Sequence, residues 1–488
     1  MSTSTAQRYL LLPPRGLQTS ASPQSMHLGP MMLGLQPQAS VPAALGGAGL
    51  RVIDTVHENG IKLVEMSDAA MLKLRLAAPG LRIVPEVFYR TARLPMAGLA
   101  AKVAPAAAGA TVLRFEVPGS TPVAGATVIA YTDYANGIGA QGRTRKDGSV
   151  RLALGGAARI QRLYVYPDHG VWPLLMRNVA LPRSKPIALA RIDLGATDAL
   201  RYFAARAPAG DGQGVTVGIV DTGVGPHGDV PLAGGANTVV GESPADIHDN
   251  GEQHGTHVAG IVGARGVAPA GMRGLAPAVA LRSYRVFGAG GQLASNYSIA
   301  KAIDIAVSDG CDLINMSLGG GPADPAISAA IADARAAGVV VICASGNDGA
   351  DEVSQPAADS RAVAVGAFGR KDLLPARSIS AEAVGRLGKD PRNFMADFSN
   401  HGQPVDLAGP GVGIVSTVPG GRWAVMDGTS MACPAVTGAT ARLLAADAAL
   451  LALARGQQRS DAILQKVFQA ARSLGFGAEY EGYGWPMK

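Results

Sequence analysis

The sequence predicts an α/β protein, in which a mostly parallel sheet covered by helices spans residues 200–488 and follows two smaller units, one α+β and one all-β sandwich. The main observation is that short, wholly apolar runs alternate with helix-like segments. A strand buried on both faces gives such a run, and strands that alternate with helices are typical of a parallel sheet. The apolar runs are Val215–Val220, Leu313–Met316, Val339–Ala344 and Ala362–Val365, and the helix-like segments include Ser295–Ser308 and Pro325–Ala337.

Composition supports a large globular chain. Of its 488 residues, 48% are hydrophobic and 16% are charged, which is enough for a large core and for more than one domain. The net charge of +6 is modest, and the densest basic stretch, Arg143–Lys146, is short, so no nucleic-acid partner is expected. No apolar run reaches about 18 residues, so no membrane span is expected either.

Residues 1–50 are expected to form a disordered tail. They contain Arg8 and Arg15 but no acidic residue, and the apolar stretch Leu10–Leu12 is followed at once by Pro13–Pro14. A secretory signal needs an unbroken apolar stretch of about 7–15 residues. We therefore expect a cytoplasmic protein, with secretion by a route not visible in the sequence as the alternative.

The α+β unit is expected over residues 51–95. Apolar residues alternate, give way to a helical run at Ala69–Ala77, and alternate again. Ser67 and Asp68 are suitable helix starters, and Pro79–Gly80 would end the helix. The pattern predicts strand, helix and strand.

The all-β module is expected over residues 108–197. Short β-rich runs are separated by Gly-Ser, Asn-Gly and Asp-Gly pairs, which are turn signals, and the stretch resembles carboxypeptidase-regulatory-like or transthyretin-like modules. Such modules bind or position, so no catalysis is assigned to this one. Gly195–Asp211 is expected to join it to the α/β domain. The β-rich runs are Thr111–Val117, Ala126–Tyr131, Gly148–Leu154 and Arg162–Pro167.

Three strings in the α/β domain carry the chemistry: Asp-Thr-Gly at Asp221–Gly223, His-Gly-Thr-His at His254–His257 and Gly-Thr-Ser-Met-Ala at Gly428–Ala432. They supply a carboxylate, an imidazole and a hydroxyl. A serine hydroxyl needs a base to accept its proton as it attacks, and a carboxylate orients that base. The order Asp, His, Ser along the chain is one of the three orders known for this geometry.

The strings, together with QGVTVGIVDTGVG at 213–225, SLGGGP at 317–322 and ASGNDG at 344–349, resemble the subtilisin family of serine proteases over roughly residues 200–488. The resemblance implies a serine endopeptidase with Asp221, His254 and Ser430 as catalytic residues and Asn347 as the oxyanion-hole donor. It also implies two backbone edges that bind an extended peptide, VFGAGG at 286–291 and the 317–320 segment. These edges give the following substrate-binding residues: Gly288, Gly290, Ser317, Leu318, Gly319 and Gly320.

The 51–95 unit resembles the inhibitor propeptide that precedes many members of this family. Its C-terminal strand would then be Ile83–Tyr89, lying in the active-site cleft. We expect an autoinhibited precursor whose intramolecular partner is this unit, with self-cleavage within Phe88–Ala97. An unrelated α+β module is the alternative.

Two stretches depart from the family pattern. Ala264–Gly274 lacks the carboxylate and amide side chains that calcium prefers, so no cofactor is expected, although calcium elsewhere stays open. Residues 370–397 form a charged insertion that would serve as a surface lid or a partner contact.

Other functions remain open at this stage. A peptide-binding pseudoenzyme would have lost part of the catalytic set, which is complete here. A metallopeptidase would rest on the pair His254 and His257 alone, and no metal ligands are assigned. The side-chain preference for a peptide or protein substrate is not legible, although Asp348 beside Asn347 would favour a basic residue near the scissile bond.

Overall fold

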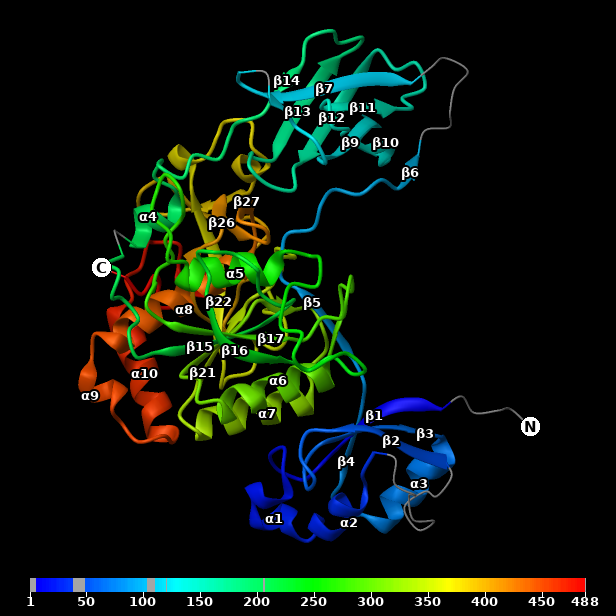
Figure 1. Cartoon of the computed structure of the whole chain (residues 1–488), viewed down its shortest axis with the longest axis vertical. Coiled ribbons are helices and arrows are strands. Elements are labelled where there is room, and N and C mark those ends of the chain that lie inside the picture. The colour runs from blue at the N-terminus through cyan, green and yellow to red at the C-terminus, as the bar shows by residue number, and fades with distance from the viewer. Residues whose placement is uncertain (1–5, 38–48, 103–109, 120, 205–206, 488) are drawn as a thin grey trace.

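The computed structural model describes residues 6–37, 49–102, 110–119, 121–204 and 207–487. The three units are arranged along the long axis of the molecule, and the α/β domain, although last in the sequence, lies between the other two (Figure 1). Among the described residues, no helix combines the length and the apolar character that crossing a bilayer requires.

The N-terminal unit is a four-stranded antiparallel sheet in the order β2-β3-β1-β4. Helix α3 begins after Ser67, whose Oγ accepts a hydrogen bond from the Ala70 N–H, an ordinary N-cap. The elements are β1 (Gln7–Leu12), η1 (Thr19–Ala21), α1 (Pro23–Met26), α2 (Gly29–Gly34), β2 (Leu50–Thr55), β3 (Lys62–Met66), α3 (Asp68–Ala77) and β4 (Arg82–Pro85).

The structure differs here from the expected disordered tail at 1–50. Strand β1 is a central strand of the sheet, and its second half, Leu10–Leu12, is buried on both faces. Leu11 packs under the helices, while Leu10 and Leu12 face the α/β domain. A strand that is buried on both faces shows no alternation of apolar and polar residues. The sequence pattern therefore does not predict this strand. Residues 1–5 and 38–48 of the predicted tail lie outside the described residues.

The all-β module is a sandwich of two sheets, in the orders β13-β12-β9-β10-β6 and β11-β7-β14, with β8 paired to β7. Leu113, Phe115 and Leu163 are among the buried residues that fill the space between them. The strands are β6 (Ala101–Lys102), β7 (Thr111–Val117), β8 (Thr121–Pro122), β9 (Thr127–Asp133), β10 (Ile138–Arg143), β11 (Ser149–Leu152), β12 (Arg159–Tyr166), β13 (Leu174–Ala180) and β14 (Ile187–Ala188). Residues 108, 109 and 120 of the predicted module lie outside the described residues.

The α/β domain contains a nine-stranded sheet in the order β16-β17-β15-β19-β21-β22-β24-β23, with β25 also paired to β22. The pairs from β16 to β22, and β22 with β25, are parallel, whereas β24 and β23 are antiparallel additions. The strands are β15 (Thr216–Asp221), β16 (Leu232–Asn237), β17 (Ala280–Arg285), β19 (Leu313–Met316), β21 (Val340–Ala344), β22 (Val363–Arg370), β23 (Val384–Leu387), β24 (Asn393–Ala396) and β25 (Val405–Pro410).

Helices cover both faces of this sheet, as predicted for an α/β fold. Helices α5 and α8 pack into one buried apolar cluster and α6 and α7 into another, on the opposite side (Figure 1). The helices are α4 (Ala199–Ala204), α5 (His254–Gly263), α6 (Asn296–Ser308), α7 (Pro325–Ala336), α8 (Thr429–Ala445), α9 (Ala448–Leu451), α10 (Gln457–Ala470) and α11 (Ala478–Glu481), with η4 (Lys371–Leu373), η5 (Ile379–Glu382) and the hairpin β26 (Ile414–Val418) and β27 (Arg422–Met426).

The charged stretch 370–397 forms part of this domain and contacts the all-β module. Leu175 of β13 donates its backbone N–H to the Arg377 carbonyl at 2.9 Å, and Arg177 pairs with Glu382. These contacts join the stretch to another unit of the same chain, and the two predicted roles, surface lid or partner contact, stay predictions.

Candidate active site

Asp221 and His254 meet where a central strand ends and a helix begins. Asp221 is the last residue of β15, and His254 is the first residue of α5. The His254 Nδ1 lies 2.7 Å from Asp221 Oδ1, and both side chains are almost wholly buried. Asp221 Oδ1 also accepts the Thr222 N–H at 2.7 Å. Because Nδ1 of His254 faces Asp221, the second ring nitrogen, Nε2, is the one that can accept a proton from another group.

Ser430 lies in the first turn of α8. The preceding Gly428 has φ +151°, and a Cβ there would lie 2.7 Å from the Ala92 carbonyl oxygen, so glycine lets the chain approach closely. The Ser430 hydroxyl donates to the Ser317 carbonyl at 3.1 Å. His254 Nε2 has no hydrogen-bond partner among the described residues. Both side chains are buried, and the Ser430 hydroxyl is turned towards Ser317.

Asn347 follows β21, which spans Val340–Ala344, and its amide is held in one orientation. Asn347 Oδ1 accepts the Thr429 N–H at 2.8 Å and the Thr429 hydroxyl at 2.9 Å. Its Nδ2 therefore points the other way and donates to the Ala92 carbonyl oxygen. The Ser430 N–H donates to the same oxygen at 3.1 Å. Two donors converging on one carbonyl oxygen beside a serine hydroxyl form the arrangement of an oxyanion hole.

The chain's own residues 88–94 run through this cleft. Strand β5 (Phe88–Thr91) is the centre of a three-stranded antiparallel sheet between β18 (Ala294–Ser295) and β20 (Leu318–Gly319). Beyond β5, the Ala92 N–H donates to the Ser317 carbonyl at 2.9 Å, and the Leu94 N–H donates to the Asp427 carbonyl at 3.0 Å. The unbroken chain thus binds on both sides of the Ala92 carbonyl.

One of the two predicted backbone edges, the 317–320 segment, pairs with β5. Leu318 pairs with Thr91 and Gly319 with Arg90, while Ser317 accepts the Ala92 N–H. Gly320 follows at the cleft wall.

The other edge differs from the prediction. The strand that pairs with β5 is Ala294–Ser295, and Gly288 and Gly290 lie in the loop before it. The side chain of Asn250 holds this loop, because Asn250 Nδ2 donates to the Gly288 carbonyl at 2.9 Å and to the Gly291 carbonyl at 3.0 Å. The Gly290 N–H donates to the Asn250 carbonyl at 2.9 Å. Gly288 and Gly290 therefore shape the loop that presents the edge.

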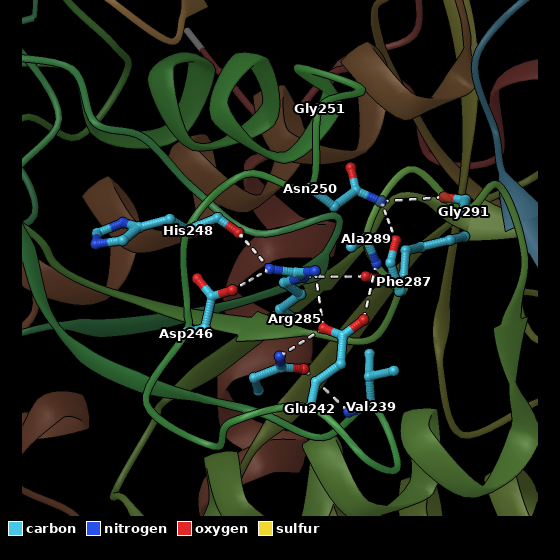
Figure 2. Close-up of polar contacts among 12 residues, drawn as sticks. Val239, Glu242, Asp246, His248, Asn250, Gly251, Arg285, Phe287, Ala289 and Gly291 are labelled. Carbon is cyan, nitrogen blue, oxygen red and sulfur yellow. Dashed lines mark hydrogen bonds and ion pairs between the residues drawn. The ribbon is translucent and has the colours of Figure 1, made fainter.

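The buried side chain of Arg285, on β17, also holds this loop in place (Figure 2). Arg285 pairs across β15 and β17 with Asp221, and its guanidinium binds Glu242 and Asp246, each at 2.8 Å. It also donates to the Phe287 carbonyl at 3.1 Å. Glu242 in turn accepts the Ala289 N–H at 2.8 Å. The network ties the loop that presents β18 to the strand end that carries Asp221.

His257 and Cys433 have structural contacts. His257 Nε2 lies 3.1 Å from the Ile414 carbonyl and 3.2 Å from the Ala424 carbonyl, and burial lowers its pKa to about 3. The Cys433 thiol donates to the Ile342 carbonyl at 3.2 Å, and burial raises its pKa. In the described part of the chain, no cluster of three or more His, Cys, Asp or Glu residues could hold a metal ion.

Sequence reasoning missed the residues whose role depends on pairing distant segments. Ala92 lies within the predicted cleavage window but carries no motif that marks it, and β18 is a two-residue strand without a pattern. Asp427 takes part through its backbone carbonyl, which no side-chain motif reports. Its position just before Gly428 was the one available signal.

Comparisons with known proteins agree with this geometry. A model described as the subtilase family matches residues 212–485. The chain is 39% identical to subtilisin BL of Lederbergia lenta over 230 residues, which is 47% of this chain and 76% of that protein, and subtilisin Savinase of the same organism gives the same figures. Subtilisin of Bacillus pumilus is 37% identical over 246 residues, or 49% of this chain and 82% of that protein. The chain belongs to the subtilase family and is a subtilisin-like serine endopeptidase.

Proposed function

We propose that the chain is the autoinhibited precursor of a serine endopeptidase, and that Asp221, His254 and Ser430 first cleave its own Ala92–Arg93 bond. One observation carries the proposal: the Ala92 carbonyl oxygen accepts hydrogen bonds from Asn347 Nδ2 and from the Ser430 N–H. These are the donors that an oxyanion would need, and the next peptide bond along the chain is Ala92–Arg93.

The reaction would begin with rotation of the Ser430 hydroxyl away from the Ser317 carbonyl. Its Oγ attacks the Ala92 carbonyl carbon while His254 Nε2 accepts the proton, and Asp221 stabilises the imidazolium. Asn347 and the Ser430 N–H hold the negative oxygen. His254 then gives the proton to the leaving Arg93 amine. Water, deprotonated by His254 in the same way, hydrolyses the acyl-enzyme and restores Ser430.

The N-terminal unit is the proposed intramolecular inhibitor. Polar contacts join it to α6 and α7. Among them, His57 Nε2 lies 2.7 Å from Asp304, Lys301 lies 2.7 Å from Asp54, and the Leu17 N–H donates to Asp333 at 2.8 Å. Apolar residues from β1 and β3 pack with those of α6 and α7 in one buried cluster. This mostly apolar contact holds the unit against the α/β domain and so positions β5, which follows the unit in the chain, in the cleft.

The bound segment also suggests a substrate preference. Ala92 is a small residue before the bond, and Tyr89 is buried with its hydroxyl donating to the Pro322 carbonyl at 2.6 Å. A Cβ at Gly321 would lie 2.5 Å from the Tyr89 ring, so glycine makes room for an aromatic side chain. We expect cleavage after small residues with an aromatic residue three positions earlier. Asp348 is exposed and lines the same cavity as Arg93, which favours a basic residue after the bond.

No cofactor enters the proposed reaction, because side chains and backbone supply every group it needs. The loop 264–274 is held by a protein carboxylate, since Asp229 Oδ2 accepts the Met272 N–H at 3.2 Å. For the compartment, similarity to subtilisins favours the secreted alternative over the cytoplasmic location suggested by the N-terminal composition.

Self-cleavage is tested by expressing the full chain beside Ser430→Ala. We expect the unmutated chain to yield a fragment whose N-terminal sequence begins Arg-Leu-Pro-Met, while the variant stays full length. A fluorophosphonate probe should label the processed protein and not the variant, which would also exclude a metallopeptidase or a non-catalytic binding protein.

Ser308→Ala, at the exposed end of α6, is the matched control and should be processed like the parent. The proposal is wrong if Ser430→Ala is cut at the same bond, or if an active, labelled chain remains intact at Ala92–Arg93.

A further inference from the structure

The larger sheet of the all-β module is apolar on both faces. Along β9, Val128 and Ala130 fill the core of the sandwich, while Ile129 and Tyr131 on the opposite face are also buried. The outer face of a sandwich strand is ordinarily polar. Tyr164 of β12 and Leu175 of β13 extend this outer cluster, so something must cover it.

The chain's own residues 97–99 provide much of that cover, together with Ile379 of the α/β domain. Ala97 and Leu99 pack against the outer cluster. The Ala97 N–H donates to the Tyr166 hydroxyl at 2.9 Å, and the Tyr131 hydroxyl donates to the Gly98 carbonyl at 2.5 Å. Both hydrogen bonds use backbone groups of the covering segment, so they would form with any extended peptide that follows the same path.

This covering segment is the continuation of the peptide bound in the active site. Ala97 is the fifth residue after the Ala92–Arg93 bond, and Leu99 is the seventh. Between them and the catalytic residues lies a cavity of about 620 Å³, whose walls come from the module (Arg143, Tyr164, Tyr166) and from the α/β domain (Glu252, Asn347, Asp427). A substrate leaving the catalytic centre along the same path as Arg93 and Leu94 reaches the module.

We propose that this face of the module, the aromatic shelf formed by Ile129, Tyr131, Tyr164, Tyr166 and Leu175, is a binding site for the leaving-group side of protein substrates. It would bind an extended peptide at the fifth to seventh residues after the scissile bond. The inference rests on the proposed cleavage of Ala92–Arg93, because that bond sets the register.

The shelf has a definite chemical preference. Two of its three hydroxyls, those of Tyr166 and Tyr131, match one backbone N–H and the carbonyl of the following residue. Its apolar surface packs on a small side chain and then a larger apolar one, as Ala97 and Leu99 do. Arg162 already has partners beside these rings: its guanidinium lies 3.6 Å from the centroid of the Tyr134 ring and donates to the Tyr164 hydroxyl at 3.3 Å. The shelf therefore favours substrates that are long enough to reach it and that are uncharged at the fifth and seventh residues after the bond.

After cleavage, the chain's own segment stays tethered to β6 and competes with substrate at a high effective concentration. Ala97→Pro removes the N–H that Tyr166 accepts and weakens this self-occupancy. The test is therefore made on the processed protein both with and without Ala97→Pro.

Two quenched fluorescent peptides provide the measurement, one matching residues 88–94 and one matching residues 88–99. Cleavage of the short peptide after its alanine tests the proposed function by itself. In the Ala97→Pro background at least, we expect kcat/KM for the long peptide to exceed that for the short peptide by about 3- to 30-fold. One or two neutral hydrogen bonds and an apolar contact would give a gain of this size.

Tyr166→Phe, which removes one hydroxyl, should lower that ratio about 3- to 10-fold. A long peptide N-methylated at its Ala97 position should lose the same factor with the Ala97→Pro protein, and little more when Tyr166→Phe is added to it. Tyr202→Phe, on α4, is the matched control and should leave the ratio unchanged. If the short peptide is cut at the expected bond but the ratio stays near one in both backgrounds, the shelf is not a substrate site. If the short peptide is not cut there, the proposed function itself has failed.

Discussion

Asp427 is a single residue that joins three parts of the cleft. Its backbone carbonyl accepts the Leu94 N–H, its Oδ1 accepts the Gly413 N–H at 2.6 Å, and its Oδ2 accepts the Ser380 hydroxyl at 2.9 Å. Burial of the carboxyl group outweighs these hydrogen bonds and raises the pKa of Asp427 to about 6. The folded state therefore favours the neutral form of this side chain.

The raised pKa has a definite sign for stability. Because the folded state holds the proton more tightly than the unfolded chain, the stabilising contribution is present below about pH 4 and is lost as the pH rises through about 6. Asp427→Asn, made on Ser430→Ala to prevent self-digestion, should raise the free energy of unfolding at pH 8 by up to about 3 kcal/mol. Denaturant unfolding at pH 4 and pH 8 measures the difference. An equal effect at both pH values would contradict the assignment.

At the scale of elements, the Arg285 network shows how a strand end and a loop act together. The guanidinium is almost wholly buried, while Glu242 and Asp246 are partly exposed. Removal of a buried cation leaves its partners without compensation, although their exposure to water reduces the cost.

Arg285→Met should therefore lower the free energy of unfolding by about 1–3 kcal/mol and raise KM, because the loop that presents β18 loses its support. Arg282→Met is the matched control on the same strand, since Arg282 pairs with Asp309 at 3.0 Å in a partly exposed position. Its cost should stay below about 1 kcal/mol. Urea unfolding and peptide kinetics test both variants, and similar losses in the two would count against a special role for Arg285.

Elements also show what sequence can and cannot reveal. The strings around Asp221, His254 and Ser430 are local, and each lies at a strand end or helix start that its own neighbours specify. The register of β5 depends instead on pairing across more than 200 residues, from Tyr89 to Ala294. Strand β1 was missed for the same reason, because Leu10 and Leu12 are buried only by a domain far along the chain.

For the whole molecule, the contact between the N-terminal unit and the α/β domain carries a titratable group. The hydrogen bond to Asp304 raises the pKa of His57 above its usual value, while burial and Lys62 oppose the shift. The charged imidazole therefore favours contact between the units at low pH, and this contribution is lost as the pH rises through the raised pKa.

The released N-terminal unit should accordingly inhibit the processed enzyme more weakly at pH 9 than at pH 6, by about two- to fivefold. His57→Gln keeps a hydrogen-bonding side chain without the charge and should flatten this dependence. Lys301→Met removes the neighbouring pair with Asp54 and should weaken inhibition similarly at both pH values. Inhibition constants for the separated unit provide the measurement, and a dependence that survives in His57→Gln would exclude His57 as its source.

The place of the proposed cut has a consequence for how activity would appear with time. The Ala92–Arg93 bond lies on the one stretch of chain that joins the N-terminal unit to the rest of the protein, so cutting it separates the two. Before it breaks, occupancy of the cleft by β5 does not depend on protein concentration. Afterwards the same contacts form a bimolecular complex, whose dissociation is favoured by dilution. A freshly processed sample should therefore gain specific activity when it is diluted, although no further bond is cut.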